Sequence, residues 1–458
     1  MLEKLLPEIN VRPVALVAAL LVPLGLLHAF VLAEIGIAVV DVLFLLTMLR
    51  AGDFAWARQR WFVLALLWWG WLVVCSVPVP SLGFGVAGWG LSFGEAFDAL
   101  RLIVFAVALQ RWVLSTARAR QAMWWALALS CLWIGLESWQ QFLTGRNIFG
   151  DHRWADGALT GPFWKPRAGQ LFAHLLFVAL LAPVLWLYGR PGLWPRVAGF
   201  LLVILGVVTS VLIGQRMGVV EAVLGLILAA FFVAQLRRVT VAALVVGAVV
   251  LVATPVISPP TYHKLVGETY VNMRHFTLSP YGEIYTRAIT MGLDSPWHGW
   301  GYNGYRVDCP QDRFTAGYPA LGIAPATVQL YACNQHPHNF YIQAFADAGV
   351  PGEVLFVLMN LAWVLALFPG LSKKPDALRV AVFVGVATYA WPFEATDAFP
   401  ILYMTGWLFL LLGLGLALAD AEQETVAGGI QGLKQADEFD APVLAAKLKS
   451  LWAGKGTN

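Results

Sequence analysis

Residues 197–257 read VAGFLLVILGVVTSVLIGQRMGVVEAVLGLILAAFFVAQLRRVTVAALVVGAVVLVATPVI, and this stretch decides the fold. It holds three apolar runs, separated only by the turn GQRMG at 214–218 and by the basic pair Arg237 and Arg238. A bilayer core about 30 Å thick requires roughly 20 apolar residues per helix, because lipid cannot pair the backbone N–H and C=O groups. The stretch therefore predicts three consecutive transmembrane helices.

The same pattern recurs along most of the 458-residue chain, which is 59% hydrophobic and only 12% charged. Soluble domains carry roughly 25% charged residues, so this composition is typical of an integral membrane protein. We expect an all-α fold with about twelve transmembrane helices. The expected spans are 13–30, 33–49, 61–79, 93–110, 122–142, 168–188, 197–215, 217–235, 239–257, 350–369, 379–396 and 399–419.

Basic residues in the short loops predict the orientation of these spans. They all fall on one side of the membrane, and the positive-inside rule makes that side the cytoplasm, together with both termini. The residues are Arg50, Arg58, Arg60, Arg111, Arg118, Arg120, Arg190, Arg196, Arg237, Arg238, Lys373, Lys374 and Arg379. The first apolar run continues into a second span without a small-residue cleavage site, so no cleavable signal peptide is expected. The net charge of +3 is too small to indicate a nucleic-acid partner.

This orientation places two polar segments, 143–167 and 258–337, in the periplasm. The chain then divides into 1–257 (nine spans and the 143–167 loop), 258–349 (a periplasmic loop and an amphipathic helix), 350–419 (three spans) and 420–458 (a cytoplasmic tail). The tail ends in APVLAAKLKSLW at 441–452, which we expect to lie on the cytoplasmic membrane surface.

The four cysteines separate into two kinds. Cys75 and Cys131 lie inside expected spans, where cysteine is a small apolar residue. Cys309 and Cys333 both lie in the large periplasmic loop, an oxidising compartment. We predict a disulfide between Cys309 and Cys333; the alternative is two free thiols too far apart to bridge.

Two arginines lie close to the periplasmic membrane face. Arg216 occupies the tight GQRMG turn, so its guanidinium must face water, a lipid headgroup or an anion; snorkelling to lipid phosphate is the simpler alternative. Arg287 lies in a helical stretch that ends in a Gly-rich turn, where an ion pair with Glu283 one helical turn earlier is the simpler alternative.

His338 is the third candidate, in the segment NQHPHNFYIQAFADAGVPGEVLFVL. Pro337 precedes it and apolar residues follow at helical spacing, which predicts that His338 lies in the first turn of a short amphipathic helix. The positive end of that helix disfavours an imidazolium, so a neutral ring could accept a proton. A structural role is the plainer alternative. His336 suggests a metal, but no further ligand completes a site, so no metal is expected there.

Other common signatures are absent from the sequence. It has no Walker A loop, no dinucleotide-binding GxGxxG after a strand, no HExxH and no serine nucleophile elbow. The few acidic residues inside spans do not form a relay, which argues against an ion-coupled transporter. They are Glu34, Asp41, Glu95, Asp98, Glu137 and Glu221.

Four motifs together resemble the bacterial O-antigen ligase and polymerase superfamily, whose members are polytopic membrane glycosyltransferases with a GT-C-like architecture. They are HPHNFYIQAFADAGVPGEVLF at 336–356, GQRMG at 214–218, YTRAITMGLDSPWHGWGYNGY at 285–305 and TGPFWKPRAGQL at 160–171. Their order, with a large periplasmic loop ahead of the histidine, also resembles the family. Lys165 and Arg167 flank Pro166 where family members often carry Asn, so the resemblance assigns them no role.

The resemblance implies transfer of O-antigen polysaccharide from undecaprenyl diphosphate to a sugar hydroxyl of the lipid A core. It maps the functional positions onto His338, as general base, and onto Arg216 and Arg287, as ligands of the donor diphosphate. Such an enzyme is expected to invert the anomeric centre and to need no metal or other cofactor. Further candidate contacts to donor or acceptor are Lys165, Arg167, Gln215, His336 and Asn339.

Three alternatives remain open at this point. An O-antigen polymerase and a protein O-oligosaccharyltransferase use the same donor and share the motifs, while the loop size and cysteine pair favour a ligase with a bulky acceptor. A flippase or secondary transporter of lipid-linked sugars is of a different class. Polar residues concentrated on one side of the membrane, and no inverted repeat, favour an enzyme.

Overall fold

The computed structural model describes residues 10–77, 89–323, 325, 333, 336–371, 376–395 and 397–437, and it is all-helical. The α-helices are α1 (Arg12–His28), α2 (Phe30–Ala51), α3 (Arg60–Cys75), α4 (Trp89–Asp98), α5 (Leu100–Ala108), α6 (Ala117–Thr144), α7 (Ala168–Tyr188), α8 (Leu193–Ile213), α9 (Arg216–Phe232), α10 (Arg237–Ile257), α11 (Pro259–Tyr262), α12 (Thr269–Arg274), α13 (Pro280–Asp294), α14 (Gly304–Asp308), α15 (Phe340–Leu367), α16 (Ala377–Tyr389) and α17 (Leu402–Asp437). The described residues form no strand and only two isolated bridges, Arg146 with His152 and Tyr318 with Ile323.

The expected all-α membrane fold is confirmed, and helices occupy most of the expected spans. The span expected at 93–110 is divided between α4 and α5, and α16 ends at Tyr389, before the expected end at 396. Among the described residues, six helices are long and apolar enough to cross a membrane, so the chain is an integral membrane protein. They are Phe30–Ala51, Ala168–Tyr188, Leu193–Ile213, Ala234–Ile257, Phe340–Leu367 and Leu402–Gln423. The helices Arg12–His28, Arg60–Cys75 and Ala377–Tyr389 are apolar but shorter.

Helix α17 forms the centre of the bundle and α10 lies at its edge. Nearly every residue of α17 from 402 to 420 is buried, and the helix packs against α1, α5, α6, α15 and α16. In contrast, α10 exposes a stripe of valines at helical spacing: Val241, Val245, Val249, Val252 and Val256. An apolar stripe of this kind fits contact with lipid chains.

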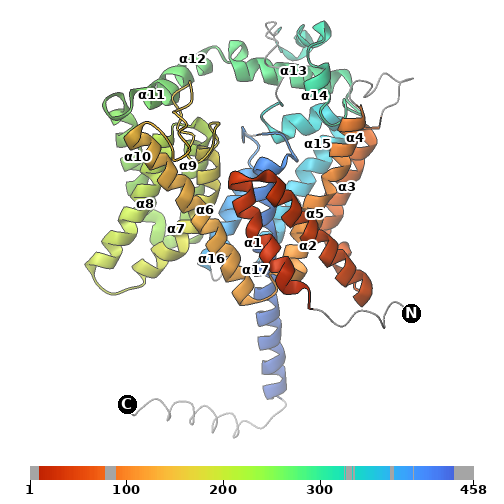
Figure 1. Ribbon diagram of the computed structural model, residues 1–458, viewed down its shortest axis with the longest axis vertical. Coiled ribbons are helices and arrows are strands. Elements are labelled where there is room, and N and C mark those ends of the chain that lie inside the picture. The colour runs from red at the N-terminus through yellow and green to blue at the C-terminus, as the bar shows by residue number, and fades with distance from the viewer. Residues whose placement is uncertain are drawn as a thin grey trace.

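The segment between α10 and α15 lies at one end of the molecule, where α11 to α14 gather, and the C-terminal part of α17 extends from the opposite end (Figure 1). Helix α17 continues to Asp437, well past the span expected at 399–419. The amphipathic piece expected at 441–452 lies outside the described residues.

A break at Gly349 divides α15 into a short first part and a membrane-length second part. Gly349 has φ 65° and ψ −168°, a conformation open essentially only to glycine. The break is joined to the turn at 296–301: Trp300 N–H donates to the carbonyl of Ala346 (2.9 Å), and Val350 N–H donates to that of Pro296 (2.7 Å).

Two further hydrogen bonds complete this junction. Gly301 N–H donates to the carbonyl of Asp347 (2.8 Å), and Trp71 Nε1 on α3 donates to that of Ala348 (2.9 Å). The carbonyls that a helix break would leave unpaired are therefore satisfied by another part of the chain, as burial requires. We call these four hydrogen bonds the 296–301/349 junction.

Replacing Gly349 with alanine should destabilise the protein strongly. A Cβ there would lie 2.5 Å from the Pro296 carbonyl oxygen, in addition to the backbone strain. Gly322→Ala is the control, because Gly322 also has a positive φ (70°) but no atom of the described residues lies within 4 Å of its added Cβ. Thermal unfolding in detergent should show a loss for Gly349→Ala clearly beyond the roughly 1–2 kcal/mol of left-handed strain expected for Gly322→Ala. Equal losses would contradict a role for the junction.

Candidate functional site

A cavity of about 1340 Å³ opens at the end of the bundle that carries α11 to α14. Seven segments line it: the 154–167 loop, Gln170 at the start of α7, the first turns of α9, the 264–285 segment, residues 303–306, the start of α15 with the residues before it, and the 392–404 segment. This volume exceeds the roughly 300–1,000 Å³ of pockets for small ligands, so the cavity suits a larger substrate. The predicted site residues that line it are Lys165, Arg167, Gln215, Arg216, His336, His338 and Asn339.

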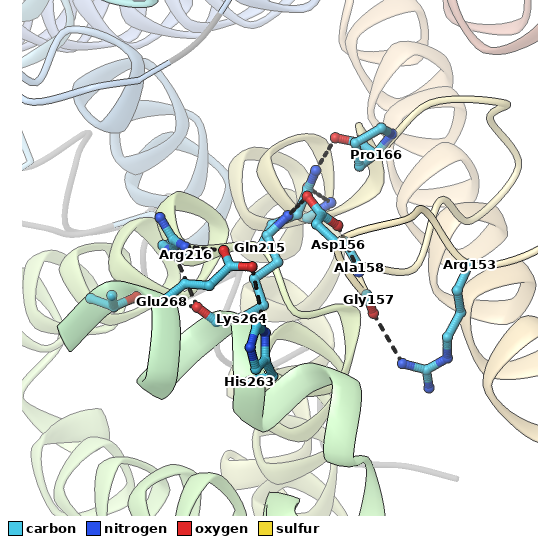
Figure 2. Close-up of polar contacts among 12 residues, drawn as sticks. Arg153, Asp156, Gly157, Ala158, Pro166, Gln215, Arg216, His263, Lys264 and Glu268 are labelled. Carbon is cyan, nitrogen blue, oxygen red and sulfur yellow. Dashed lines mark hydrogen bonds and ion pairs between the residues drawn. The ribbon is translucent and has the colours of Figure 1, made fainter. Parts of the chain in front are cut away.

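Arg216 is the first residue of α9 and lies on the cavity wall. Figure 2 shows its guanidinium directed at Glu268: Nη2 lies 2.5 Å from the Glu268 carboxylate, and Nε donates to the carbonyl of Lys264 (3.1 Å). The unpaired N–H groups and positive dipole end of α9 lie at the same place. A guanidinium at a helix N-terminus is a well-suited site for a phosphate group.

A second ion pair lies on the same wall of the cavity. Lys264 pairs with Asp156 of the 154–167 loop, and His263 Nδ1 lies 3.5 Å from the Glu268 carboxylate (Figure 2). The segment around η6 (His263–Glu268) is thereby attached to the loop and to α9 by charged contacts. The sequence alone does not reveal the ion pairs of Lys264, Asp156 and Glu268, because the paired residues lie far apart along the chain.

Gln215 has internal partners. Its side-chain oxygen accepts from the backbone N–H groups of Gly169 and Gln170 at the start of α7, and its amide group donates to the carbonyl of Pro166. Helices α7 and α9 meet closely here, since a Cβ on Gly218 would lie 2.6 Å from the Gly169 backbone. Gln215 therefore positions the Lys165–Arg167 segment relative to Arg216.

Lys165 and Arg167 are both paired with aromatic rings. The Lys165 Nζ lies 4.4 Å from the Trp164 ring centre, and the Arg167 guanidinium lies 3.5 Å from that of Tyr403. Arg167 also lies 3.9 Å from the Asp397 carboxylate. The ring contacts restrict both cations to the cavity wall.

His338 lies just before α15 and not in its first turn, so the predicted position is wrong by two residues. The helix begins at Phe340, and His338 has a positive φ of 55°. The reason is Asn339, whose side-chain oxygen caps the helix by accepting from the N–H groups of Tyr341 and Ile342 (both 3.0 Å). The Asn339 amide group also donates to the carbonyls of Pro392 (2.7 Å) and Glu394 (3.1 Å), which fixes this cap to the 392–404 segment.

His338 belongs to a row of three polar side chains. Its Nδ1 lies 3.1 Å from Nε2 of His336, and the same Nε2 lies 3.2 Å from Oδ1 of Asp397. Asp397 was not identified in the sequence, because it is 59 residues from His338 and has no motif around it. Asp397 contacts the histidine pair from the side of His336 and orients it.

Tyr281 and Tyr285 line the cavity beside His338, and the Tyr281 and His338 rings lie 5.8 Å apart. Burial raises the pKa of Tyr281, and the positive charge of Arg216 opposes that rise. Burial also raises the pKa of Tyr285 to about 12. Both phenols therefore keep their protons near neutral pH and can donate hydrogen bonds into the cavity.

Arg287 is not among the residues that line the cavity. It is 1% exposed, and its Nη1 lies 2.8 Å from the Cys333 sulfur and 3.7 Å from the Cys309 sulfur. A disulfide joins these two cysteines, with their Cα atoms 5.5 Å apart. Burial raises the pKa of Glu283, one turn earlier on α13, and the charge of Arg287 opposes that rise.

Residues 200–357 match the family model described as O-Antigen ligase. This match identifies an O-antigen ligase domain, a kind shared by ligases, polymerases and related glycosyl-transferring enzymes that use a lipid-linked donor. The matched range contains Arg216, Arg287 and His338, whereas Arg167 and Asp397 lie outside it. No curated protein matches the chain significantly.

Glu268 should compete with a diphosphate for Arg216. The Glu268→Gln variant is therefore expected to bind farnesyl diphosphate, a short lipid diphosphate, up to about fivefold more tightly, since a partly exposed ion pair is worth roughly 0.2–1 kcal/mol. Isothermal titration calorimetry in detergent measures this. Asp294→Asn is the control, because it removes the Asp294–Arg313 ion pair, which is exposed and does not line the cavity. Weaker binding by Glu268→Gln would contradict the competition.

Proposed function

We propose that this protein is an O-antigen ligase. It transfers O-antigen polysaccharide from undecaprenyl diphosphate to a sugar hydroxyl of the lipid A core, on the periplasmic side of the inner membrane. The observation that carries the proposal is that Arg216, at a helix N-terminus, and the His336–His338–Asp397 row line one cavity. The family match supports transfer from a lipid-linked donor.

The donor diphosphate binds at the N-terminus of α9. As the bond between sugar and diphosphate breaks, negative charge develops on the leaving oxygen, and a fixed guanidinium with helix N–H groups stabilises it. Arg216 exchanges the Glu268 carboxylate for phosphate oxygens in this step. The half-buried Tyr281 phenol, which lines the same cavity as Arg216, supplies a further donor.

The acceptor hydroxyl is activated by His338. As the hydroxyl oxygen bonds to the anomeric carbon, its proton passes to His338, and the bond to the diphosphate breaks with its electron pair staying on the diphosphate. Attack opposite the leaving group inverts the anomeric centre and leaves undecaprenyl diphosphate as the second product. His338 shares the proton with His336 through the contact between Nδ1 of His338 and Nε2 of His336. Asp397 lies against the same Nε2 and stabilises the protonated form of His336.

Arg287 acts on this reaction from a distance. Its buried contact with the Cys309–Cys333 disulfide holds α13 against Cys333, three residues before His336 in the chain. Arg287 is therefore a positioning residue for the wall that carries Tyr281 and His338. Lys165 and Arg167, restricted by their aromatic rings, are available to the sugar phosphates or to the acceptor.

The space available for a bulky acceptor favours a ligase over a polymerase. The cavity of about 1340 Å³ and the disulfide-braced segment between α10 and α15 suit a branched core oligosaccharide. A polymerase would instead accept another lipid-linked repeat unit. The two activities differ only in the acceptor, so a defined assay separates them.

Purified protein supplied only with undecaprenyl-diphosphate-linked O-antigen and lipid A-core should join the two, as seen on a gel. His338→Ala and Arg216→Ala should each lower the rate by at least about 100-fold, because a general base contributes roughly 10²–10⁴-fold and removal of a charge-stabilising donor costs a similar factor. Arg306→Ala is the control, because Arg306 is a cavity arginine without a role in the proposed steps.

Two other results of this assay would change the assignment. Longer lipid-linked chains with a bare core would identify a polymerase. Full activity of folded His338→Ala would overturn the general-base assignment.

Activity should also persist in EDTA, because fixed guanidinium and N–H groups balance the diphosphate charge. Rapid loss on chelation would contradict a metal-independent reaction.

Asp397→Asn should lower kcat about tenfold or more and leave KM for the donor within about twofold, since Asp397 acts through the histidine pair. Without the carboxylate the imidazolium is less stable, so the acidic limb of the pH–rate profile should move to lower pH. Asp397→Glu should recover part of the rate. An unchanged pH profile would show that Asp397 is only structural.

A further inference from the structure

A second polar cluster lies beneath the cavity, within the helix bundle. It contains His174 of α7, Glu221 of α9 and Glu394, which follows α16, and all three side chains are at most 1% exposed. His174 Nε2 lies 3.4 Å from a Glu221 carboxylate oxygen and 3.7 Å from one of Glu394. One atom of each residue lies within 4.8 Å of the other two, so three ligand-type atoms converge on one point.

The tautomer of His174 follows from its other neighbour. Nδ1 lies 2.9 Å from the Thr388 hydroxyl, and that hydroxyl donates its own proton to the carbonyl of Gly385 (2.8 Å). Thr388 must therefore accept from Nδ1–H. In a neutral ring this leaves the lone pair on Nε2, pointing between two carboxylates. Metal-bound histidines are fixed in this way, with the second nitrogen donating to a neighbouring oxygen.

The charges of the cluster are not balanced by basic side chains. Within the described residues, His174 is the only basic residue that forms an ion pair with Glu221 or Glu394. Among the described residues, Nε2 of His174 is buried without a hydrogen-bond partner, and Glu221 lies against the Glu394 carboxyl and the Gln170 amide but against no cation other than His174. Two carboxylates in an apolar interior require neutralisation by a bound cation or by protons.

We propose that His174, Glu221 and Glu394 bind one divalent cation of the zinc type. Two carboxylates and a neutral imidazole cancel the charge of a divalent ion, so the occupied site is neutral as a whole. Tetrahedral ligands at roughly 2.0–2.1 Å from zinc lie about 3.3 Å from one another, close to the 3.4 and 3.7 Å separations from Nε2. Three protein ligands leave the fourth position to water.

The ion has a structural role. It joins α7, α9 and the 392–404 segment, and the carbonyl of Glu394 is one of the two that anchor Asn339 ahead of α15. Gln170, which lines the cavity, donates to the Glu394 carboxylate (3.1 Å). The ion would thus fix the cavity wall that carries Asp397. No step of the proposed transfer passes through it, and its burial protects it from brief exposure to a chelator.

The test is elemental analysis of the full-length protein, purified in detergent through a tag without histidines and without chelators. About one zinc per chain is expected, and His174→Gln and Glu221→Gln should each lose it. Asp41→Asn is the matched control, because Asp41 is also a buried carboxylate inside the bundle but belongs to α2. Protein grown with cobalt should show the visible absorption of tetrahedral Co²⁺, absent from both cluster variants.

Two results would overturn the site. Wild type that carries no metal and takes up none from added zinc would show that protons neutralise the cluster. Metal retained by both cluster variants would place it elsewhere, for example on the His336 and His338 pair. If the variants fail to fold, X-ray absorption on wild type still decides. One imidazole among oxygen ligands supports the site, whereas two imidazoles or any sulfur excludes it.

Discussion

The 296–301/349 junction is the contact on which the site depends. A helix that breaks inside a membrane protein must find partners for the backbone groups it releases. Here the turn after α13 supplies most of them and Trp71 on α3 supplies one more, so α13 and the start of α15 are held together by backbone hydrogen bonds that require glycine at position 349. This one junction sets where His338 enters the cavity and where Tyr281 lies beside it.

Most of the fold could be predicted because lipid imposes a simple rule on the chain. Apolar runs of span length must become helices, and helices occupy most of the expected spans in the structure. The break in α15 falls at Gly349, two residues before Pro351, within an apolar run. The start of α15 was placed two residues early, because sequence periodicity does not distinguish Asn339 as a cap from His338 as the first helical residue.

Only the site residues that belong to short sequence motifs could be predicted. Arg216 and His338 stand in short, ordered motifs, and both line the cavity. Asp397, Glu268 and Glu394 stand in no motif, and each is brought to its partner by packing between segments at least 50 residues apart. Arg287 shows the converse: its motif is clear, yet its burial against a disulfide depends on tertiary packing that sequence spacing does not report.

The charges of the site fall into two classes by exposure, and this division explains how it could work. Arg216 and Glu268 are 23% and 35% exposed, so water screens their ion pair and exchanging Glu268 for a diphosphate costs little. His174, Glu221 and Glu394 are closed off from water, where an unbalanced charge is far more costly to change. The exchangeable ion pair therefore lines the cavity, where substrate charge enters and leaves, whereas the buried cluster lies outside the lining and contacts it through Gln170. A lipid diphosphate needs both: a binding site that releases its product, and a wall that does not shift when the charge of the ligand changes.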